Sequence, residues 1–299
     1  MKYSKLHERN GNRTKSVCLH TRFLFSGMFI VMMFFVFSGA AFAQEIEEID
    51  YNKGYNFIET KYYSEEEDQE LLKLYEDLRV ADVSDGMDYV GLPGTGLVDP
   101  AIHAHWKDYD SMKHIIRGIA LTVRYVPTQE PAHPSDDKDF DAWVGKTYTE
   151  ETSEAFVPLI HKGTVIMIDD VEEMDIGTIG SNNILLWKLK GAVGVITDAS
   201  SRDTDEVALQ EVPLYLRKTG RGIRPGRNVL ESVNRPISMG GVLVNPGDVV
   251  VADGDGVIVV PRKVAREVAE YAKETLEGDK AGRRNMYKKL GMPEDMTVK

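Results

Sequence analysis

The sequence predicts an α/β fold, a mixed α/β sandwich in which helices cover a central sheet. Residues 164–198 alternate strand, helix and strand, which is typical of an α/β layer. Short strands separated by tight turns follow over residues 242–260, and a long amphipathic helix begins at Arg262. With 42% hydrophobic residues in 299, the chain has enough apolar material for a sizeable core.

The first 43 residues predict a secretory signal peptide. Residues 1–22 are basic, residues 23–37 form an uncharged apolar run, and Ala41-Phe42-Ala43 provides a cleavage box. We therefore expect cleavage after Ala43, export to the periplasm or the medium, and no membrane attachment of the mature chain. The alternative is a retained anchor, because the apolar run approaches the ~20 residues that span a bilayer.

Residues 44–66 are acidic and rich in tyrosine, and they predict an extended N-terminal arm. Leucines and valines over residues 68–89 predict two short helices with a break near Ala81. Alternating apolar residues predict a strand at 116–126. The Pro- and Asp-rich residues 127–145 predict a long loop.

Thr147 and Glu150 have the spacing of a capping box, which predicts a helix through residues 155–160. Strands are predicted at 164–169 and 193–198, with a helix at 182–190 between them. Residues 213–216 predict another strand, followed by a basic, Gly-rich loop that begins at Arg217 and ends at Arg227.

Three short strands, at 242–244, 248–252 and 257–260, are separated by Asn-Pro-Gly and Asp-Gly turns. The helix that begins at Arg262 is expected to end near Leu276, with a second helical piece from Gly278 to Leu290. No internal repeat is visible, so residues 67–299 are interpreted as one domain with C-terminal helices.

Composition excludes several classes of protein. The formal net charge of −12 makes a nucleic-acid partner held by phosphate neutralisation unexpected. The chain has one cysteine, Cys18, which excludes a disulfide framework and a cysteine-based zinc site. Because Cys18 lies in the predicted signal peptide, the mature chain would contain no thiol, which suits an oxidising compartment.

Two polar segments flank the strand at 193–198. After the strand come Arg202 and Asp203, at the carboxyl end where ligands of open α/β sheets gather. Arginine can bind a carboxylate or an enolate oxygen, and aspartate can bind a hard divalent cation. The alternative is a surface ion pair or a helix cap.

The second segment precedes the strand and opens the helix at 182–190. Gly180, Ser181, Asn182 and Asn183 leave backbone N–H groups free, and these can bind a carboxylate. Simple helix capping is the alternative for this segment alone. Together, the two segments could bind both ends of a small oxoacid and a metal ion.

Several runs in this order resemble the RraA-like family, which includes 4-hydroxy-4-methyl-2-oxoglutarate aldolases and the regulator of ribonuclease activity A. The central run is KGTVIMID, then IGSNN, then KGAVGVITDASSRD. Further matches are VSD at 83–85, RGIALTV at 117–123, GGVLVNPGD at 240–248 and ADGDGV at 252–257. The resemblance extends over residues 71–291 and implies the mixed α/β sandwich of that family, assembled as a trimer or hexamer.

The resemblance also implies chemistry. Arg202 would bind the 2-oxo and enolate oxygens of pyruvate, Asp203 would bind Mg²⁺ or Mn²⁺, and residues 180–183 would bind the pyruvate carboxylate. The implied function is a divalent-metal-dependent lyase that cleaves a C–C bond in a 2-oxoacid, such as 4-hydroxy-4-methyl-2-oxoglutarate or oxaloacetate. The alternative is a non-catalytic regulator that acts by protein–protein contact.

One position departs from the family. Its aldolases usually have an acid twenty-one residues before the arginine, and this chain has Ser181 there. Asp169, Asp170 and Asp175 are nearby candidates to replace that acid. A second family acid comes from the C-terminal helices of a neighbouring subunit, and the candidates here are Glu277 and Asp279.

Four other patterns have simpler interpretations. His103 and His105 could share one face of a strand, but no third metal ligand is evident, so a solvated loop is preferred. The run 136–141 is interpreted as a solvated acidic lid, and 253–256 as an Asp-Gly hairpin turn. The basic stretch either binds an anionic substrate or balances acidic neighbours across an interface; its members are Arg217, Lys218, Arg221, Arg224 and Arg227.

Overall fold

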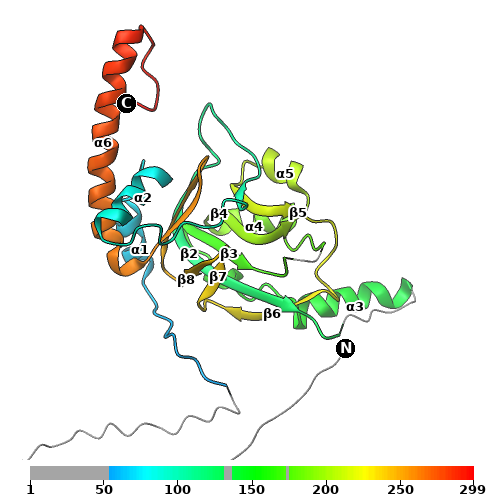
Figure 1. Cartoon of the computed structure of the whole chain (residues 1–299). Coiled ribbons are helices and arrows are strands. Elements are labelled where there is room, and N and C mark those ends of the chain that lie inside the picture. Colours follow the sequence, from blue (N-terminus) through cyan, green and yellow to red (C-terminus); the bar gives the residue numbers. More distant parts are fainter. Residues whose placement is uncertain (1–53, 131–136, 173–174) are drawn as a thin grey trace, which may run out of the picture. The chain divides into compact units, whose positions relative to one another are not determined.

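The computed structural model describes residues 54–130, 137–172 and 175–299. The chain divides into two compact units, Met1–Tyr55 and Asn56–Lys299, and the second contains every element below (Figure 1). The predicted signal peptide, and residues 44–53 of the predicted arm, lie outside the described residues. No helix in the described ranges is both long and apolar enough to cross a bilayer.

Helices are distributed along the second unit from its beginning to its end. They are α1 (Glu65–Leu72), α2 (Val80–Tyr89), α3 (Asp137–Glu150), α4 (Ser181–Lys190), α5 (Thr204–Leu209) and α6 (Ala265–Leu290), with short 3₁₀ turns at Val157–Leu159 and Arg262–Val264.

Ten strands are described. They are β1 (His103–Ala104), β2 (Ile116–Pro127), β3 (Thr164–Asp169), β4 (Ala192–Ser201), β5 (Leu214–Thr219), β6 (Asn228–Val233), β7 (Ile237–Met239), β8 (Val242–Val244), β9 (Val249–Asp253) and β10 (Gly256–Val260).

Eight strands form one mixed sheet in the order β1-β5-β4-β3-β2-β9-β10, with β6 also paired to β2. Strands β2 to β5 run parallel, whereas β1, β6, β9 and β10 are antiparallel to their neighbours. Strand β2 pairs with β3 along one edge, and along its other edge the first part of its 12 residues pairs with β9 and the last part with β6. The remaining strands, β7 and β8, form a separate hairpin.

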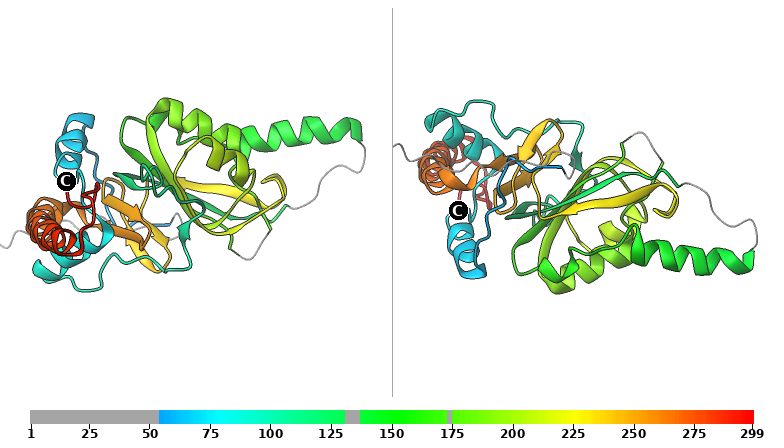
Figure 2. Two further views of the ribbon diagram at one scale, coloured as in Figure 1. Left: turned by 90° about the horizontal axis from the view of Figure 1, so that it is seen from above. Right: turned by 90° about the horizontal axis from the view of Figure 1, so that it is seen from below.

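The sheet curves until its two end strands, β1 and β10, lie close to each other, which makes it nearly barrel-like. Its inner face packs with the β7–β8 hairpin, through Ile116, Met167, Ile196 and Val250, which are fully buried. On the outer face, α4 packs over the parallel strands through Ile184 and Trp187. Seen from above and from below, α3 and α4 lie on the side of the sheet away from α6 (Figure 2).

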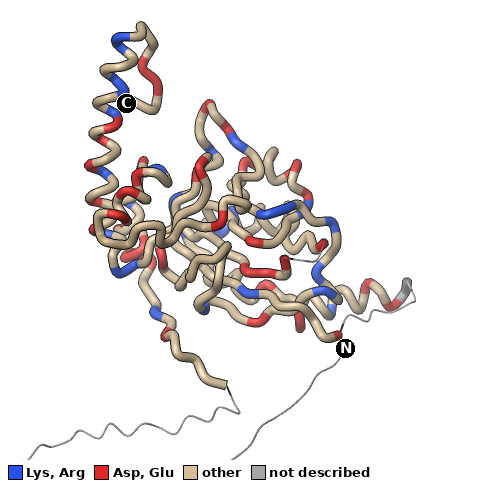
Figure 3. Tube along the Cα trace, in the orientation of Figure 1, with Lys and Arg blue, Asp and Glu red and all other residues tan. Residues whose placement is uncertain are grey.

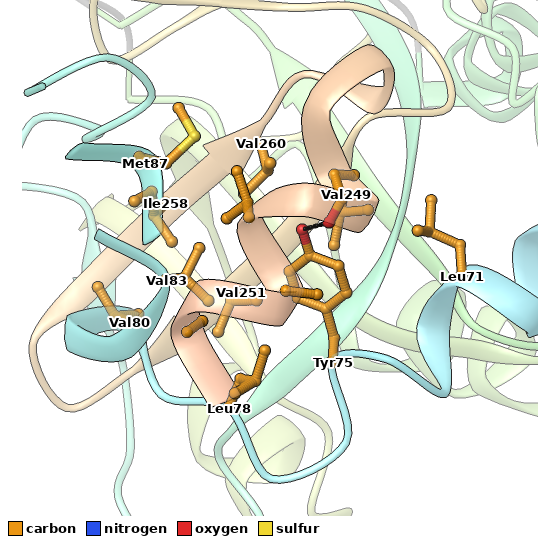
Figure 4. Packing of buried hydrophobic residues seen from close by; sticks show 14 of the residues in the cluster. Leu71, Tyr75, Leu78, Val80, Val83, Met87, Val249, Val251, Ile258 and Val260 are labelled. Atoms are coloured by element: carbon orange, nitrogen blue, oxygen red, sulfur yellow. Dashed lines mark hydrogen bonds between the residues drawn. The ribbon is translucent and has the colours of Figure 1, made fainter. Parts of the chain in front are cut away.

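Helices α1, α2 and α6 cover another part of the outer face. Valines of β9 and β10 pack against Val83 and Met87 of α2 and against the apolar stripe of α6 (Figure 4). The buried hydroxyl of Tyr75 donates to the carbonyl of Ala265 at 2.7 Å, so the only polar atom of that ring is satisfied. The mixed α/β class predicted from the sequence is confirmed.

The predicted strands at 116–126, 164–169 and 193–198 are confirmed as β2, β3 and β4, and the helix at 182–190 as α4. The three short strands before Arg262 and the Asp-Gly turn at 253–256 are also confirmed. The strand predicted at 213–216 continues to Thr219, so the basic loop starts later than expected.

Strand β6 was not predicted. It is an edge strand in which Asn228 is buried and the other residues are half-buried or exposed, because it pairs only with the end of β2. Its polar residues Asn228, Glu231 and Ser232 therefore hide the strand pattern.

The prediction of a loop over 127–145 was wrong for residues 137–145, which belong to α3. The prolines of this segment all precede residue 135, and Trp143, Val144 and Tyr148 then recur at helical spacing and are half-buried. The acidic run is accordingly the first turn of a helix from Asp137 onward, where acids are favourable. Asp136 lies outside the described residues.

The helix predicted through 155–160 from Thr147 was also wrong. Thr147 lies in the last turn of α3, where its carbonyl accepts from the amides of Glu151 and Thr152. Only the 3₁₀ turn Val157–Leu159 follows.

Two helix boundaries differ from prediction. Ala81 lies inside α2, and the break falls at 73–79, where Asp77 takes a positive φ of 70° and the Arg79 amide donates to Asp82 Oδ2 at 2.9 Å. Helix α6 continues through Gly278, because buried residues up to Leu276 anchor it and ion pairs flank the glycine.

Candidate active site

Strand β4 delivers the first half of the candidate site. It ends at Ser201, so Arg202 and Asp203 occupy the junction with α5. The chain at Ile179 pairs with Ser201, the Arg202 amide donates to the Ile179 carbonyl at 2.9 Å, and the Ser201 hydroxyl donates to the same carbonyl at 2.8 Å. This pairing places the start of α4 beside the end of β4.

Two glycines allow the segments to approach so closely. A Cβ at Gly177 would lie 2.5 Å from Arg202 Cβ, and a Cβ at Gly180 would lie 2.8 Å from Asp203 Oδ2. Gly180 also caps α4 with extended backbone. Larger residues would separate α4 from the Arg-Asp pair.

Arg202 and Asp203 are half-exposed neighbours with 3.6 Å between Arg202 Nε and Asp203 Oδ2. Asp203 has a φ of 55°, the left-handed conformation that aspartate tolerates better than most residues. Its Oδ2 also accepts from the Ser181 amide at 3.4 Å. Both contacts are long, so the carboxylate faces the start of α4 without being tightly bound.

The predicted anion-binding residues have different surroundings. Ser181 is buried, and its hydroxyl donates to Oε2 of Glu206 at 2.5 Å. Asn182 is exposed. The backbone N–H groups of Asn182 and Asn183 lie in the first turn, which has no intrahelical acceptors, and no acceptor for them is found among the described residues.

The Asn183 side chain has a different task from the one predicted. Its amide donates to the carboxylate of Glu154, which also accepts from Trp187 Nε1 at 3.1 Å and from Arg224 at 2.9 Å. Asn183 therefore anchors α4, and only its backbone is available to a ligand.

The three acids expected as replacements for the acid missing at 181 have other partners. Asp170 is buried and accepts from Asn228 at 2.8 Å and from Thr178. Asp175 pairs with Arg221 at 2.7 Å, and Asp169 lies 3.4 Å from Arg124. In the described ranges, none of these carboxylates contacts Ser181, Arg202 or Asp203.

Glu206 is the residue that the sequence analysis missed. It follows Asp203 by three positions, and a glutamate at the third position of a helix points back toward the helix start. Recognising that α5 begins right after Asp203 would have placed Glu206 at the site, but this helix is only six residues long.

Asp198 of β4 is a second group that the sequence analysis did not single out. Its Oδ1 accepts from the Asp170 amide at 3.2 Å. Burial, and then the neighbouring charge of Asp169, raise the pKa of Asp198 to about 7.

The basic stretch pairs mainly with acids of the same chain. Arg217 contacts Asp99 at 2.7 Å and Glu172 at 3.1 Å, Lys218 donates to the Glu172 carbonyl, and Arg221 and Arg224 pair as described above. Arg227 donates to the Ile223 carbonyl. These acidic partners belong to the same chain and do not lie across an interface.

The other candidates lie apart from this site. His103 is exposed and contacts the Ala101 carbonyl. The described ranges contain no group of three or more His, Cys, Asp or Glu arranged to hold a metal. On α6, where acidic and basic residues are interspersed (Figure 3), Glu277 lies 3.5 Å from Lys280 and Asp279 lies 3.0 Å from Arg79.

A divalent cation fits the donor chemistry at Asp203. The carboxylate is accessible, and its two long contacts leave oxygen lone pairs available. Mg²⁺ binds through one or two carboxylates and keeps several waters, so one solvent-accessible carboxylate suits it.

Comparisons with known proteins bear on this site. The Thermus thermophilus 4-hydroxy-4-methyl-2-oxoglutarate aldolase is 32% identical over 102 residues, 33% of this chain and 60% of that protein. Protein DlpA of Legionella pneumophila is 25% identical over 190 residues, 63% of this chain and 27% of that protein. The chain thus matches less than two thirds of the length of either relative.

The fold has solved counterparts. The structure of RraAS2 from Streptomyces coelicolor, described as an unusual member of the RNase ES inhibitor RraA protein family, has a TM-score of 0.60. It is 23% identical and covers 73% of this chain and 98% of its own, a likeness of fold. The RraA-like family model, described as Aldolase/RraA, matches residues 80–259. Because this match covers more than half of the chain, from α2 into β10, and contains the candidate site, the chain belongs to the RraA-like family.

Proposed function

We propose that this protein is a divalent-metal-dependent lyase that cleaves a C–C bond in a 2-oxoacid and releases pyruvate. The substrate class includes 4-hydroxy-4-methyl-2-oxoglutarate and oxaloacetate. The observation that carries the proposal is the contact between the Arg202–Asp203 pair and the start of α4, in a member of the RraA-like family. The aldolase from Thermus thermophilus supports the reaction class.

Each group in the proposed site binds the part of the substrate or the cation that has the opposite charge. The free amides of Asn182 and Asn183 bind the substrate carboxylate at the positive end of α4, together with the backbone at Gly180 and Ser181. The Arg202 guanidinium donates to the 2-oxo oxygen, where negative charge grows as the enolate forms. Asp203 is the protein ligand for Mg²⁺ or Mn²⁺, and the cation supplies Lewis-acid stabilisation of that charge.

The proposal is tested by measuring pyruvate release from both substrates with and without EDTA. We expect turnover that EDTA abolishes and Mg²⁺ or Mn²⁺ restores. Asp203→Ala should lower kcat/KM by about 100-fold or more, because it removes the metal ligand. Asp205→Ala, an exposed acid two residues away, serves as the control and should keep full activity.

The outcome that contradicts the lyase is a folded protein with no metal-dependent turnover of any oxoacid. A protein partner recovered in stoichiometric amounts by metal-free protein would then favour the alternative, a regulator that acts by contact.

We also propose that the protein is exported after cleavage behind Ala43, on the signal-peptide pattern of residues 1–43. Intact-mass measurement of protein recovered from the periplasm or medium checks this. A mass that retains residues 1–43 would contradict cleavage.

A further inference from the structure

Two carboxylates converge on Ser181. Its hydroxyl donates to Glu206 Oε2 at 2.5 Å, and its amide donates to Asp203 Oδ2 at 3.4 Å. The aldolases that this chain resembles usually have an acid at the position of Ser181. In this chain, Glu206 of α5 places a carboxylate in contact with residue 181, where those aldolases have their own acid.

Ser181 is poorly suited to take a proton itself. It is only 4% exposed, and its hydroxyl is oriented as a donor because a carboxylate can only accept. An aliphatic hydroxyl is also a weak base compared with a carboxylate. Its contact with Glu206 instead holds that side chain in place.

Glu206 has the access that Ser181 lacks. The residue is exposed, and Ser181 engages only one of its carboxylate oxygens. Among the described residues no Lys, Arg or His pairs with Glu206, whereas Asp169 and Asp175 both lie against arginines. The second oxygen of Glu206 therefore has no partner among the described residues, and both Glu206 and Asp203 contact Ser181.

We propose that Glu206, positioned by Ser181, is the proton acceptor for aldol cleavage at this site; the inference rests on the proposed lyase function. The 4-hydroxyl proton of a 4-hydroxy-2-oxoacid passes to Glu206 as the C3–C4 bond breaks. C4 becomes a carbonyl carbon, and the electron pair of the broken bond forms the enolate of pyruvate. The proton on Glu206 then returns to C3 and gives pyruvate.

This assignment separates two reactions at one site. Oxaloacetate loses its C4 carboxylate as CO₂, and that carboxylate is already ionised, so no hydroxyl proton has to be removed. The enolate that remains takes the proton for C3 from water. Decarboxylation therefore needs Arg202 and Asp203 but not Glu206. A purely structural role for Glu206 would affect both reactions equally.

The decisive variant is Glu206→Gln, because the amide oxygen can still accept from Ser181 while the side chain can no longer take up a proton. We expect kcat for aldol cleavage to fall by about 100-fold or more, with KM and oxaloacetate decarboxylation changed by less than about fivefold. The Kd for Mn²⁺, measured by calorimetry, should stay within about threefold of wild type. Asp205→Asn, the neighbouring acid of α5, is the matched control and should match wild type in all three measurements.

Rescue gives a second, independent readout. Ser181→Asp combined with Glu206→Gln returns a carboxylate to position 181. We expect the double variant to cleave at least about tenfold faster than Glu206→Gln alone. Glu206→Asp keeps the carboxylate on a shorter side chain, so its kcat for aldol cleavage should fall less than that of Glu206→Gln.

The inference is overturned if Glu206→Gln cleaves at a rate close to that of Asp205→Asn, or if both reactions fall together. In either case the lyase proposal survives, provided that the wild type is active. A wild type that binds Mn²⁺ but turns over no oxoacid overturns the lyase proposal itself.

Discussion

Single residues at this site differ in how strongly the fold has changed their chemistry. Asp203 lies exposed just after the end of β4, whereas Asp198, five residues earlier and inside that strand, has a pKa of about 7 because of burial and of the charge of Asp169. A carboxyl group that is neutral in the folded protein and ionised in the unfolded chain links stability to pH.

The sign of this linkage can be predicted. Because the folded-state pKa of Asp198 is raised, the contribution of this group to stability is fully present below the ordinary pKa of aspartate. That contribution is lost as the pH rises to about 7. Asp198→Asn mimics the neutral form, so it should stabilise the protein by about 1–2 kcal/mol at pH 8, or roughly 3–6 °C in Tm. Near pH 4 the variant and the wild type should unfold alike.

Thermal unfolding of both proteins between pH 4 and pH 8 checks this prediction. Asp175→Asn is a control of opposite sign, because the hydrogen bond from Arg221 lowers the pKa of Asp175. The ionised form of Asp175 therefore stabilises the folded protein at a pH above the ordinary pKa of aspartate, and its replacement should destabilise the protein there. A difference between wild type and Asp198→Asn that does not change with pH would contradict the raised pKa.

At the scale of elements, glycines decide how closely helices approach and how far they extend. Gly86 of α2 lies where a Cβ would be 2.6 Å from the Val268 carbonyl oxygen of α6. Gly278 lies in the interior of α6 with no atom within 4 Å of such a Cβ. Both are helical glycines, so one substitution tests packing and the other tests helix propensity.

Gly86→Ala should destabilise the protein by about 1–3 kcal/mol, because α2 and α6 must move apart. Gly278→Ala should stabilise it by about 0.5–1 kcal/mol, because alanine favours the helix and meets nothing. Urea unfolding of the two variants gives both values. If Gly278→Ala were destabilising, α6 would not be continuous through residue 278.

For the whole molecule, the exposed apolar surface over α4 and α5 suggests assembly. Leu185, Leu186 and Leu189 of α4 are 44%, 44% and 83% exposed, and Leu209 of the adjacent α5 is 85% exposed. Large apolar side chains gathered in this way favour a covered surface. We therefore propose a homotrimer or hexamer in which this leucine patch contacts a second copy.

Leu189→Glu combined with Leu209→Glu should shift the assembly to monomer, because burying two charges in a contact is unfavourable. Light scattering after gel filtration measures the mass. Leu290→Glu, an exposed leucine at the end of α6, is the control and should leave the mass unchanged. A wild type that is monomeric, or a double variant that stays assembled, would contradict the proposed interface.

Much of the fold was predictable because its signals are local. The central parts of β3 and β4 are continuous apolar runs, the apolar residues of β2 alternate along the chain, and α4 ends at a glycine with positive φ. The errors fell where a local signal was ambiguous: Thr147 has the spacing of a cap but lies inside a helix, and prolines before residue 135 obscured α3.

The sequence by itself determined the α/β class, most strands of the sheet, the positions of Arg202, Asp203 and the Gly180–Asn183 segment, and the resemblance to the RraA-like family. These depend on the order and spacing of neighbouring residues. Only the tertiary structure decided that Asn183 binds Glu154, that Asp170 and Asp175 have other partners, and that Glu206 meets Ser181. Such contacts join residues far apart in the chain, and they depend on how β4, α4 and α5 pack together.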